Sequence, residues 1–271
     1  MERRDFIKRL ALLAACPLCA ETAYAAEAEH WSYEGEAGPE HWGSLSNENS
    51  ACSAGSQQSP LDIRGAIKAD IPGLALNWKS GGAILNNGHT IQVKAAPGGT
   101  LRRGDKPYEL VQYHFHAPSE HLVEGHRFPM EVHFVHKHAE TGALGVLGVF
   151  FVPGAANTTF ASLAATFPQK IFFVPGAANT TFASLAATFP QKTGEQTALP
   201  NVDPSGLLPT SLRYWAYEGS LTTPPCSEIV DWMIAQDPIE VDAADIDRFT
   251  ALYSMNARPA LVANRRYILA S

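Results

Sequence analysis

The chain has 271 residues, of which 45% are hydrophobic and 17% are charged, and its formal net charge is −7 at pH 7. This composition is that of a globular protein and excludes a disordered or collagen-like chain. No stretch approaches the roughly 20 apolar residues of a membrane-spanning helix, and an acidic chain without a basic stripe is not expected to bind nucleic acid.

The first 25 residues are typical of a cleaved export signal. A basic start with Arg3 and Arg4 precedes an apolar run at 10–20, and the sequence AYA at 23–25 fits a cleavage site. The two arginines resemble a twin-arginine signal, with an ordinary Sec signal as the alternative. Lipidation at Cys16 is a weaker alternative because the apolar run before it is short. We therefore expect residues 1–25 to be removed and residues 26–271 to form the mature domain, in the periplasm or secreted.

The mature chain is expected to be one mainly β domain with minor helices. Short β-rich runs separated by Gly, Pro and Asn clusters predict strands at 91–95, 108–116, 130–137, 144–152, 213–217 and 229–235. Helical periodicity is confined to 159–167 and 243–253. The second of these has Asp242 as a plausible N-cap and places Ile246, Phe249 and Tyr253 on one face. No Gly/Ser-rich linker divides the chain.

An exact tandem duplication interrupts this pattern. Residues 150–170 recur without a single change at 172–192, and this 22-residue period divides the region into copies at 150–171 and 172–192. Two copies are too few for a solenoid, which needs at least about three repeats to bury a core. A recent duplication and an error in the sequence both fit the identity of the copies. We expect one structural position that either copy can fill, with the other copy excluded from it.

The mature chain retains two cysteines, Cys52 and Cys226. In an oxidising compartment a pair of cysteines suggests one disulfide, and two unpaired thiols are the alternative.

The histidines suggest a metal site. In a strand, His114 and His116 project from one face because side chains alternate. His133 lies in another strand-like run and would complete a three-histidine site if the two strands are neighbours. Three neutral imidazoles leave the fourth position of zinc open for water, which is a catalytic arrangement. Gln112 and Glu131 lie where they could orient the imidazoles by hydrogen bonds.

The other histidines are less favoured as ligands. His136 and His138 form a second His-x-His pair, which we expect to be exposed because it runs into a turn at 139–142. His121 and His126 lie in a Gly- and Pro-containing connection and are expected to be structural or solvated.

Two other metalloenzyme classes can be compared by motif. No H-E-x-x-H occurs, so a zincin protease is unsupported. His114, His116 and Glu120 match half of a cupin metal motif, but Tyr108 and Arg127 stand where that motif has glycines, and no second cupin motif follows.

A series of motifs resembles the α-class carbonic anhydrases over residues 30–269. In order they are WSY at 31–33, GPEHW at 38–42, QSPLDI at 58–63, NGH at 87–89, QYHFH at 112–116, SEH at 119–121, EVHFV at 131–135, GSLTTPPCSE at 219–228 and NARP at 256–259. Each motif alone is weak, but together and in this order they are highly specific.

The resemblance implies a fold and a reaction. The fold is a central, twisted, largely antiparallel sheet of about ten strands, with zinc at the floor of a conical cleft. The reaction is the reversible hydration of carbon dioxide to bicarbonate and a proton by attack of zinc-bound hydroxide. The implied zinc ligands are His114, His116 and His133.

The resemblance also assigns the remaining roles. Thr222 and Glu120 would orient the hydroxide, and His89 would shuttle the proton to solvent. The apolar pocket for carbon dioxide would be formed by Val135, Val146, Leu221, Thr223 and Trp232. The peptide bonds Ser59–Pro60 and Pro224–Pro225 would be cis.

The expected partner is a small-molecule substrate, and a homodimer is possible, although no interface can be identified from the sequence. Two alternatives remain: a catalytically impaired relative that serves as a binding protein, and a cupin-like metalloenzyme. Impaired relatives typically lose a zinc histidine, whereas this chain keeps all three.

Overall fold

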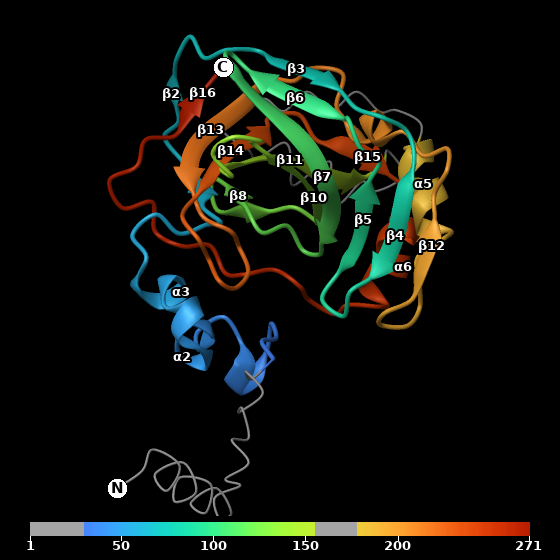
Figure 1. The fold of residues 1–271 in the computed structure, drawn as a ribbon, viewed down its shortest axis with the longest axis horizontal. Helices are drawn as coiled ribbons and strands as arrows, with labels where there is room; N and C mark the ends of the chain where they lie inside the picture. The colour runs from blue at the N-terminus through green and yellow to red at the C-terminus, as the bar shows by residue number, and fades with distance from the viewer. Residues whose placement is uncertain (1–29, 155–177) are drawn as a thin grey trace, which may run out of the picture. The chain divides into compact units, whose positions relative to one another are not determined.

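A mixed sheet of 13 strands dominates the unit that spans Trp31–Ser271 (Figure 1). The structure is a computed structural model that describes residues 30–154 and 178–271. The predicted export signal at 1–25 and the predicted helix at 159–167 lie outside the described residues. Within the described ranges, no helix is long and apolar enough to cross a membrane.

The strands of the large sheet follow the order β12-β4-β5-β7-β10-β11-β14-β13-β16-β2, with β15 beside β11 and with β6 joining β3 to β7. Their bounds are β2 Ile67–Lys68, β3 Leu74–Asn77, β4 Gly82–Asn86, β5 Ile91–Ala95, β6 Thr100–Arg103, β7 Lys106–His116, β10 Met130–Lys137, β11 Leu144–Pro153, β12 Gln196–Ala198, β13 Tyr214–Gly219, β14 Val230–Ala235, β15 Ile239–Val241 and β16 Leu269–Ala270. A small second sheet contains β1 Asp62–Ile63, β8 Leu122–Val123 and β9 His126–Arg127.

The helices are short. They are α2 Trp42–Leu45, α3 Ala51–Ala54, α5 Thr180–Ala186 and α6 Ala243–Thr250, with 3₁₀ turns η1 Gly35–Ala37, η2 Asn47–Asn49 and η3 Pro204–Leu207. The side chain of Asp242 caps α6 by accepting a hydrogen bond from the backbone N–H of Ala244, as the sequence predicts.

The six strands predicted from sequence form the continuous centre of the sheet, β5-β7-β10-β11-β14-β13. The mainly β, single-domain prediction is therefore confirmed. The sheet is wider than expected because several short strands extend its edges and sides. It is also mixed, since β11 runs parallel to β14 and to β15. Ser59–Pro60 and Pro224–Pro225 are cis as expected, and Ala117–Pro118 is cis as well.

Alternation along the central strands divides the buried side chains between two faces. Tyr113 and Phe115 of β7 belong to one apolar cluster, which helices α5 and α6 complete with Phe182 and Phe249. The next residues along the strand, His114 and His116, point to the opposite face. Burial of one large apolar side chain stabilises the fold by roughly 1.5–3 kcal/mol. The packed face therefore holds the strands in the register that places His114 opposite His133 on the other face.

The duplicated unit is assembled from both copies. Phe150–Pro153 of the first copy ends β11, and α5 comes from the second copy. The N–H of Gly154 donates to the Val241 carbonyl (2.8 Å), and the N–H of Asn179 donates to the adjacent Glu240 carbonyl (3.1 Å). Among the described residues, the end of β11 therefore comes from the first copy and α5 from the second.

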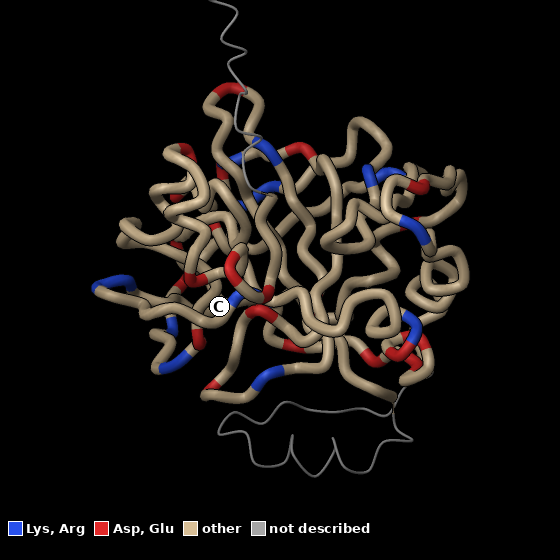
Figure 2. The backbone as a smooth tube through the Cα atoms, turned by 90° about the horizontal axis from the view of Figure 1, so that it is seen from below, with Lys and Arg blue, Asp and Glu red and all other residues tan. Residues whose placement is uncertain are grey.

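Charged residues are distributed over the described fold without a single-sign stripe (Figure 2). Basic and acidic positions are interspersed along the backbone in this view.

Candidate metal centre

Two neighbouring antiparallel strands bring the three predicted histidines together. His114 of β7 lies directly opposite His133 of β10, and His116 lies opposite Glu131. The ring centroids of the three histidines are 4.6 to 5.4 Å apart. One nitrogen from each ring lies within 4.8 Å of the other two. The strand pairing therefore creates a cluster of three convergent imidazoles.

The second nitrogen of each ring is held by a hydrogen bond. His114 Nδ1 donates to Gln112 Oε1 (2.9 Å), His116 Nδ1 to the Asn256 carbonyl (2.7 Å), and His133 Nε2 to Glu131 Oε1 (2.8 Å). A carbonyl oxygen can only accept, so the proton of His116 resides on Nδ1 and its Nε2 carries a lone pair. These contacts fix the ring orientations and leave His114 Nε2, His116 Nε2 and His133 Nδ1 for a common ligand.

The hydrogen-bonding state of His116 Nε2 shows whether the cluster is suited to a metal ion. His116 Nε2 is buried and has no hydrogen-bond partner within the described ranges. A buried polar atom without a partner is costly and calls for an explanation such as an ion. Three imidazole nitrogens are a common donor set for catalytic zinc, which keeps its fourth position open. The residues present therefore fit a zinc ion.

Burial also favours the metal-binding protonation state of two ligands. It lowers the pKa of both His114 and His116, and in His114 the other two imidazoles reinforce the effect. Burial acts in the same direction on His133, but the charge and hydrogen bond of Glu131, together with Glu120, outweigh it and raise the pKa. His114 and His116 are thus neutral at neutral pH, which is the form that binds metals.

A second cluster, His121, Glu131 and His133, also brings three possible ligands together. Its hydrogen bonds are already made. Glu131 Oε1 accepts from His121 Nδ1 and His133 Nε2 (both 2.8 Å), and its Oε2 accepts from the backbone N–H groups of Glu120 and His121 (both 2.9 Å). The Tyr217 hydroxyl donates to His121 Nε2 (2.6 Å). This cluster is a satisfied network that supports His133, so His121 is structural.

Glu120 lies fully buried beside the metal cluster. Its Oε1 accepts from the backbone N–H of Arg258 (2.9 Å). Its Oε2 is 3.6 Å from His116 Nε2 and 3.8 Å from His133 Nδ1, and it has no hydrogen-bond partner in the part of the chain described. Thr222 is also buried. Because Oε2 has no partner, the expected Thr222–Glu120 hydrogen bond is not made in this structure.

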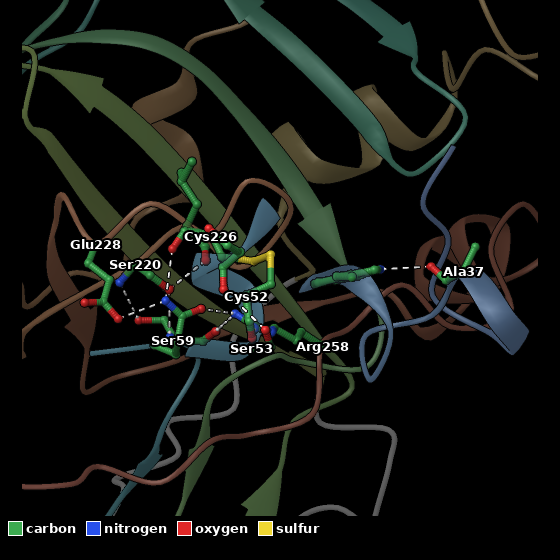
Figure 3. The surroundings of a disulfide bond; sticks show 12 residues. Ala37, Cys52, Ser53, Ser59, Ser220, Cys226, Glu228 and Arg258 are labelled. Atoms are coloured by element: carbon green, nitrogen blue, oxygen red, sulfur yellow. Dashed lines mark hydrogen bonds between the residues drawn. A yellow bond between two sulfur atoms is a disulfide. The ribbon is translucent and has the colours of Figure 1, made fainter. Parts of the chain in front are cut away.

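A disulfide holds the loop that carries Thr222 (Figure 3). Cys52 of α3 is bonded to Cys226, as expected from the cysteine count. Beside it, the backbone N–H of Ser59 donates to Ser220 Oγ (2.9 Å), and the backbone N–H of Ser220 donates to Ser59 Oγ (3.1 Å). Cys52 and Ser59 thereby hold the 220–226 loop at positions before and after Thr222.

The residues expected to bind carbon dioxide form an apolar wall beside His133. Val135, Val146 and Trp232 are paired in register across β10, β11 and β14. The indole of Trp232 is 4.9 Å from the His133 ring, centroid to centroid. Leu221 packs against the same apolar cluster, and Thr223 is half-buried two residues further along the chain. A small apolar molecule would meet this wall next to the metal ligands.

His89 lies at the turn between β4 and β5. Its backbone N–H donates to Asn87 Oδ1 (2.9 Å), and its side chain is half-buried. The imidazole stacks on Trp31, with 3.7 Å between ring centroids and 9° between the planes.

Two contributors to the site were missed in the sequence. The carbonyl of Asn256 orients His116, and no side-chain pattern reveals a backbone acceptor. Gly148 lies opposite His133, where an added Cβ would be 2.9 Å from Glu131 Oε1 and 2.7 Å from Ile234 Cδ1. A glycine within an apolar strand run is a signal of such close approach.

The prediction that His136 is exposed was wrong. Its imidazole is fully buried: Trp78 Nε1 donates to its Nε2 (3.1 Å) and its Nδ1 donates to the Gly145 carbonyl (3.1 Å). β10 continues to Lys137, so alternation places His136 on the same packed face as Phe134. His138, its predicted pair, is half-buried.

Comparisons with known proteins agree with the motifs. A family model described as eukaryotic-type carbonic anhydrase matches residues 37–270. A carbonic anhydrase of Pectobacterium carotovorum is 40% identical over 250 residues, which cover 92% of this chain and 93% of the relative. A carbonic anhydrase of Neisseria gonorrhoeae is 36% identical over 271 residues, which cover 97% of this chain and 98% of the relative.

Solved structures give the same result. The α-carbonic anhydrase of Thermovibrio ammonificans, in complex with the inhibitor sulfanilamide, matches with a TM-score of 0.78 at 36% identity and covers 89% of this chain and 98% of its own. The Photobacterium profundum α-carbonic anhydrase matches with a TM-score of 0.76 at 36% identity, and the match covers 89% of this chain and 100% of its own.

Proposed function

The chain belongs to the eukaryotic-type carbonic anhydrase family, and on this premise we propose that it hydrates carbon dioxide reversibly at a zinc ion held by His114, His116 and His133. The observation that carries the proposal is the buried, unpartnered Nε2 of His116, which converges with one nitrogen from each of the other two rings. When bound by three imidazoles, zinc supplies a hydroxide nucleophile by lowering the pKa of water to about 7, for which carbonic anhydrase is the reference example.

The residues around the ligands would hold the ion's geometry. Gln112, Glu131 and the Asn256 carbonyl fix the three rings, so that the donor nitrogens need not reorganise when the ion binds. Glu131 is in turn held by two backbone N–H groups and by His121. Losing one of these outer contacts is expected to weaken zinc binding roughly 10- to 100-fold, whereas losing a ligand should abolish stoichiometric zinc binding.

Glu120 and Thr222 would orient the nucleophile. The free Oε2 of Glu120 can accept the proton of the Thr222 hydroxyl, and the threonine oxygen then has a lone pair to accept a hydrogen bond from the nucleophile. The backbone N–H of Arg258 holds the other carboxylate oxygen, and the disulfide-clamped loop holds Thr222. The pair would act on orientation without touching the ion.

The apolar wall would position the substrate. Carbon dioxide has no hydrogen-bond donor, so the side chains of Val135, Val146, Leu221 and Trp232 can hold it against His133 and exclude competing water. Bicarbonate is charged and is not retained by such a surface.

His89 would carry the product proton to solvent. An imidazole titrates near neutral pH and can both accept and release a proton there. Two observations support this role: the side chain is half-buried at a turn, and Asn256, whose carbonyl orients His116, donates through Nδ2 to the His89 carbonyl (3.0 Å).

We also propose that the protein is exported after removal of residues 1–25. The disulfide between Cys52 and Cys226 supports this, because such bonds persist in oxidising compartments. No observation favours the catalytically impaired alternative, since the zinc histidines, Glu120 and Thr222 are all present.

The roles can be separated by kinetics on zinc-loaded protein. Thr222→Ala should retain zinc but lose kcat by a factor of at least about 100, because its group acts mainly in the transition state. His89→Ala should lose turnover only in dilute buffer and recover it when imidazole is added, whereas the control His138→Ala should match the wild type. Wild-type rates in Thr222→Ala, or a His89→Ala rate that does not depend on buffer, would contradict these assignments.

A further inference from the structure

A cavity of about 720 Å³ lies apart from the metal centre. It is bordered by β2, β13 and β16, by the start of β7 and by the segment that precedes β16. None of the three metal histidines, Glu120 or Thr222 lines it. Its volume is within the range of small-molecule sites, roughly 300–1,000 Å³. The proposed reaction does not use this cavity.

Basic groups outnumber acidic groups in its lining by four to three, in a chain of net charge −7. Asp231 is already engaged by Arg103, by Lys106 at 3.6 Å and by the Tyr108 hydroxyl at 3.2 Å. One carboxylate therefore serves two cations. The other two acids, Asp105 and Glu218, are exposed. Among the charged lining residues that are not exposed, Arg103 and Arg266 are basic and Asp231 is acidic, so this part of the lining carries a net positive charge.

Arg266 supplies a positive charge that makes no ion pair with a carboxylate of the described residues. Its guanidinium donates to the carbonyls of Gln58 (2.8 Å), Ala263 (3.0 Å), Glu218 (3.1 Å) and Val262 (3.1 Å), and it lies 5.7 Å from the Tyr217 ring centroid. Burial lowers the pKa of Arg266, as expected for a cation with incomplete compensation. The neighbouring Arg265 is exposed and makes no ion pair with a described residue.

The same cavity has an apolar side. Tyr267 and Ile67, which are 75% and 48% exposed, both line it. A ligand bound in the cavity could cover the exposed apolar area of both side chains. The Tyr267 ring in particular offers a face for stacking. Apolar walls thus adjoin the two arginines within one cavity.

We propose that this cavity binds a small monoanion with an apolar body, of the aromatic carboxylate class. Its carboxylate would be attracted by Arg265 and Arg266, and its ring would cover Tyr267 and Ile67. A doubly charged anion fits less well, because the exposed acids Asp105 and Glu218 border the same space. A neutral aromatic molecule would gain only the apolar contacts.

The test is calorimetric titration of the zinc-loaded mature protein with benzoate at low ionic strength, and in parallel with benzamide, its neutral counterpart. We expect saturable benzoate binding with a dissociation constant of about 1 mM, which is reasonable for a ligand of this size. Benzamide should bind at least about fivefold more weakly, since it lacks the charge that the arginines attract.

Two cavity variants and one control locate the binding. Arg265→Glu should weaken benzoate binding at least about fivefold because it replaces an attraction by a repulsion. Tyr267→Ala should weaken benzoate and benzamide alike. Arg102→Glu is the matched control, since Arg102 is exposed on the same strand as Arg103 but does not line the cavity. All three variants should keep wild-type zinc content and carbon dioxide hydration.

Absence of saturable benzoate binding would overturn the proposal. So would equal benzoate affinity in Arg265→Glu and Arg102→Glu, because the ligand would then bind elsewhere, for example at the metal centre.

Discussion

His136 makes the stability of the protein depend on pH in a way that can be measured. Its Nδ1 faces a carbonyl and must carry a proton, and its Nε2 faces the N–H of Trp78 and must not. Burial lowers the pKa of His136 from 6.5 to about 4, although the carbonyls of Gly145 and Phe134 act in the opposite direction. The native state therefore requires the neutral ring.

The sign and size of the effect follow from this shift. Below pH 6.5 the unfolded chain takes up a proton at His136, whereas the native state does so only near pH 4. Stability is therefore unaffected at neutral pH and falls as the pH drops from about 6.5 to about 4. A shift of about 2.5 units corresponds to a loss of about 3 kcal/mol at the end of that window.

The assay is denaturant unfolding of zinc-loaded wild type and of His136→Gln at about pH 7.5 and about pH 4.5. Glutamine does not titrate, and its amide oxygen can still accept from Trp78. The wild type should lose about 2–3 kcal/mol more than the variant between the two pH values. His138→Gln serves as the control and should behave like the wild type. Equal pH dependence of His136→Gln and wild type would refute the argument.

Three further predictions concern the framework of the site. Gly148→Ala should lower zinc affinity at least about tenfold, because the added methyl would displace Glu131 from the His133 ring that it holds. Unchanged affinity in a competitive chelator titration would show that Glu131 and Ile234 can shift to accommodate the methyl. Replacing Cys52 and Cys226 together by serine should destabilise the protein by up to roughly 5 kcal/mol, given a separation of 174 residues; the idea fails if the midpoint of denaturant unfolding does not move. Deleting 22 residues from the duplicated region, for example 155–176, should preserve zinc and activity and raise the Tm by a few degrees, since chain closure costs less for a shorter connection; a lower Tm would mean that both copies contribute to packing.

The last variant does not depend on which copy is removed. Because the two copies are identical, any 22-residue deletion within them gives the same chain. On either side of the junction, the backbone N–H groups of Gly154 and Asn179 already donate to adjacent carbonyls of β15, those of Val241 and Glu240. The expected stabilisation is about 2 kcal/mol on a chain-closure estimate.

The sequence was sufficient for the central strands because their residues alternate between packed and site-facing positions. Tyr113 and Phe115 bury one face while His114 and His116 occupy the other, so the same pattern reveals both the strand and the candidate ligands. The short edge strands were not predicted because two to four residues are too few to show a period. Strands such as β2 and β16 depend on their partners in the sheet.

The errors at the site have local physical causes. His136 was predicted to be exposed because a turn follows it. It lies two residues after Phe134, however, and therefore shares the packed face of that residue. Asn256 acts through a backbone carbonyl, for which side-chain identity gives no signal. The hybrid origin of the β11–α5 unit could not be predicted, because identical copies satisfy the same packing equally well.

The central claim is that three particular histidines bind zinc for carbon dioxide hydration. The most direct test combines zinc analysis, zinc-edge X-ray absorption and carbon dioxide hydration on the mature protein, His116→Ala and His121→Gln. We predict about one zinc per wild-type chain with three nitrogen ligands at about 2.0–2.1 Å, loss of zinc and activity in His116→Ala, and retention of zinc in His121→Gln. Stoichiometric zinc in His116→Ala, or zinc lost only in His121→Gln, would contradict the account.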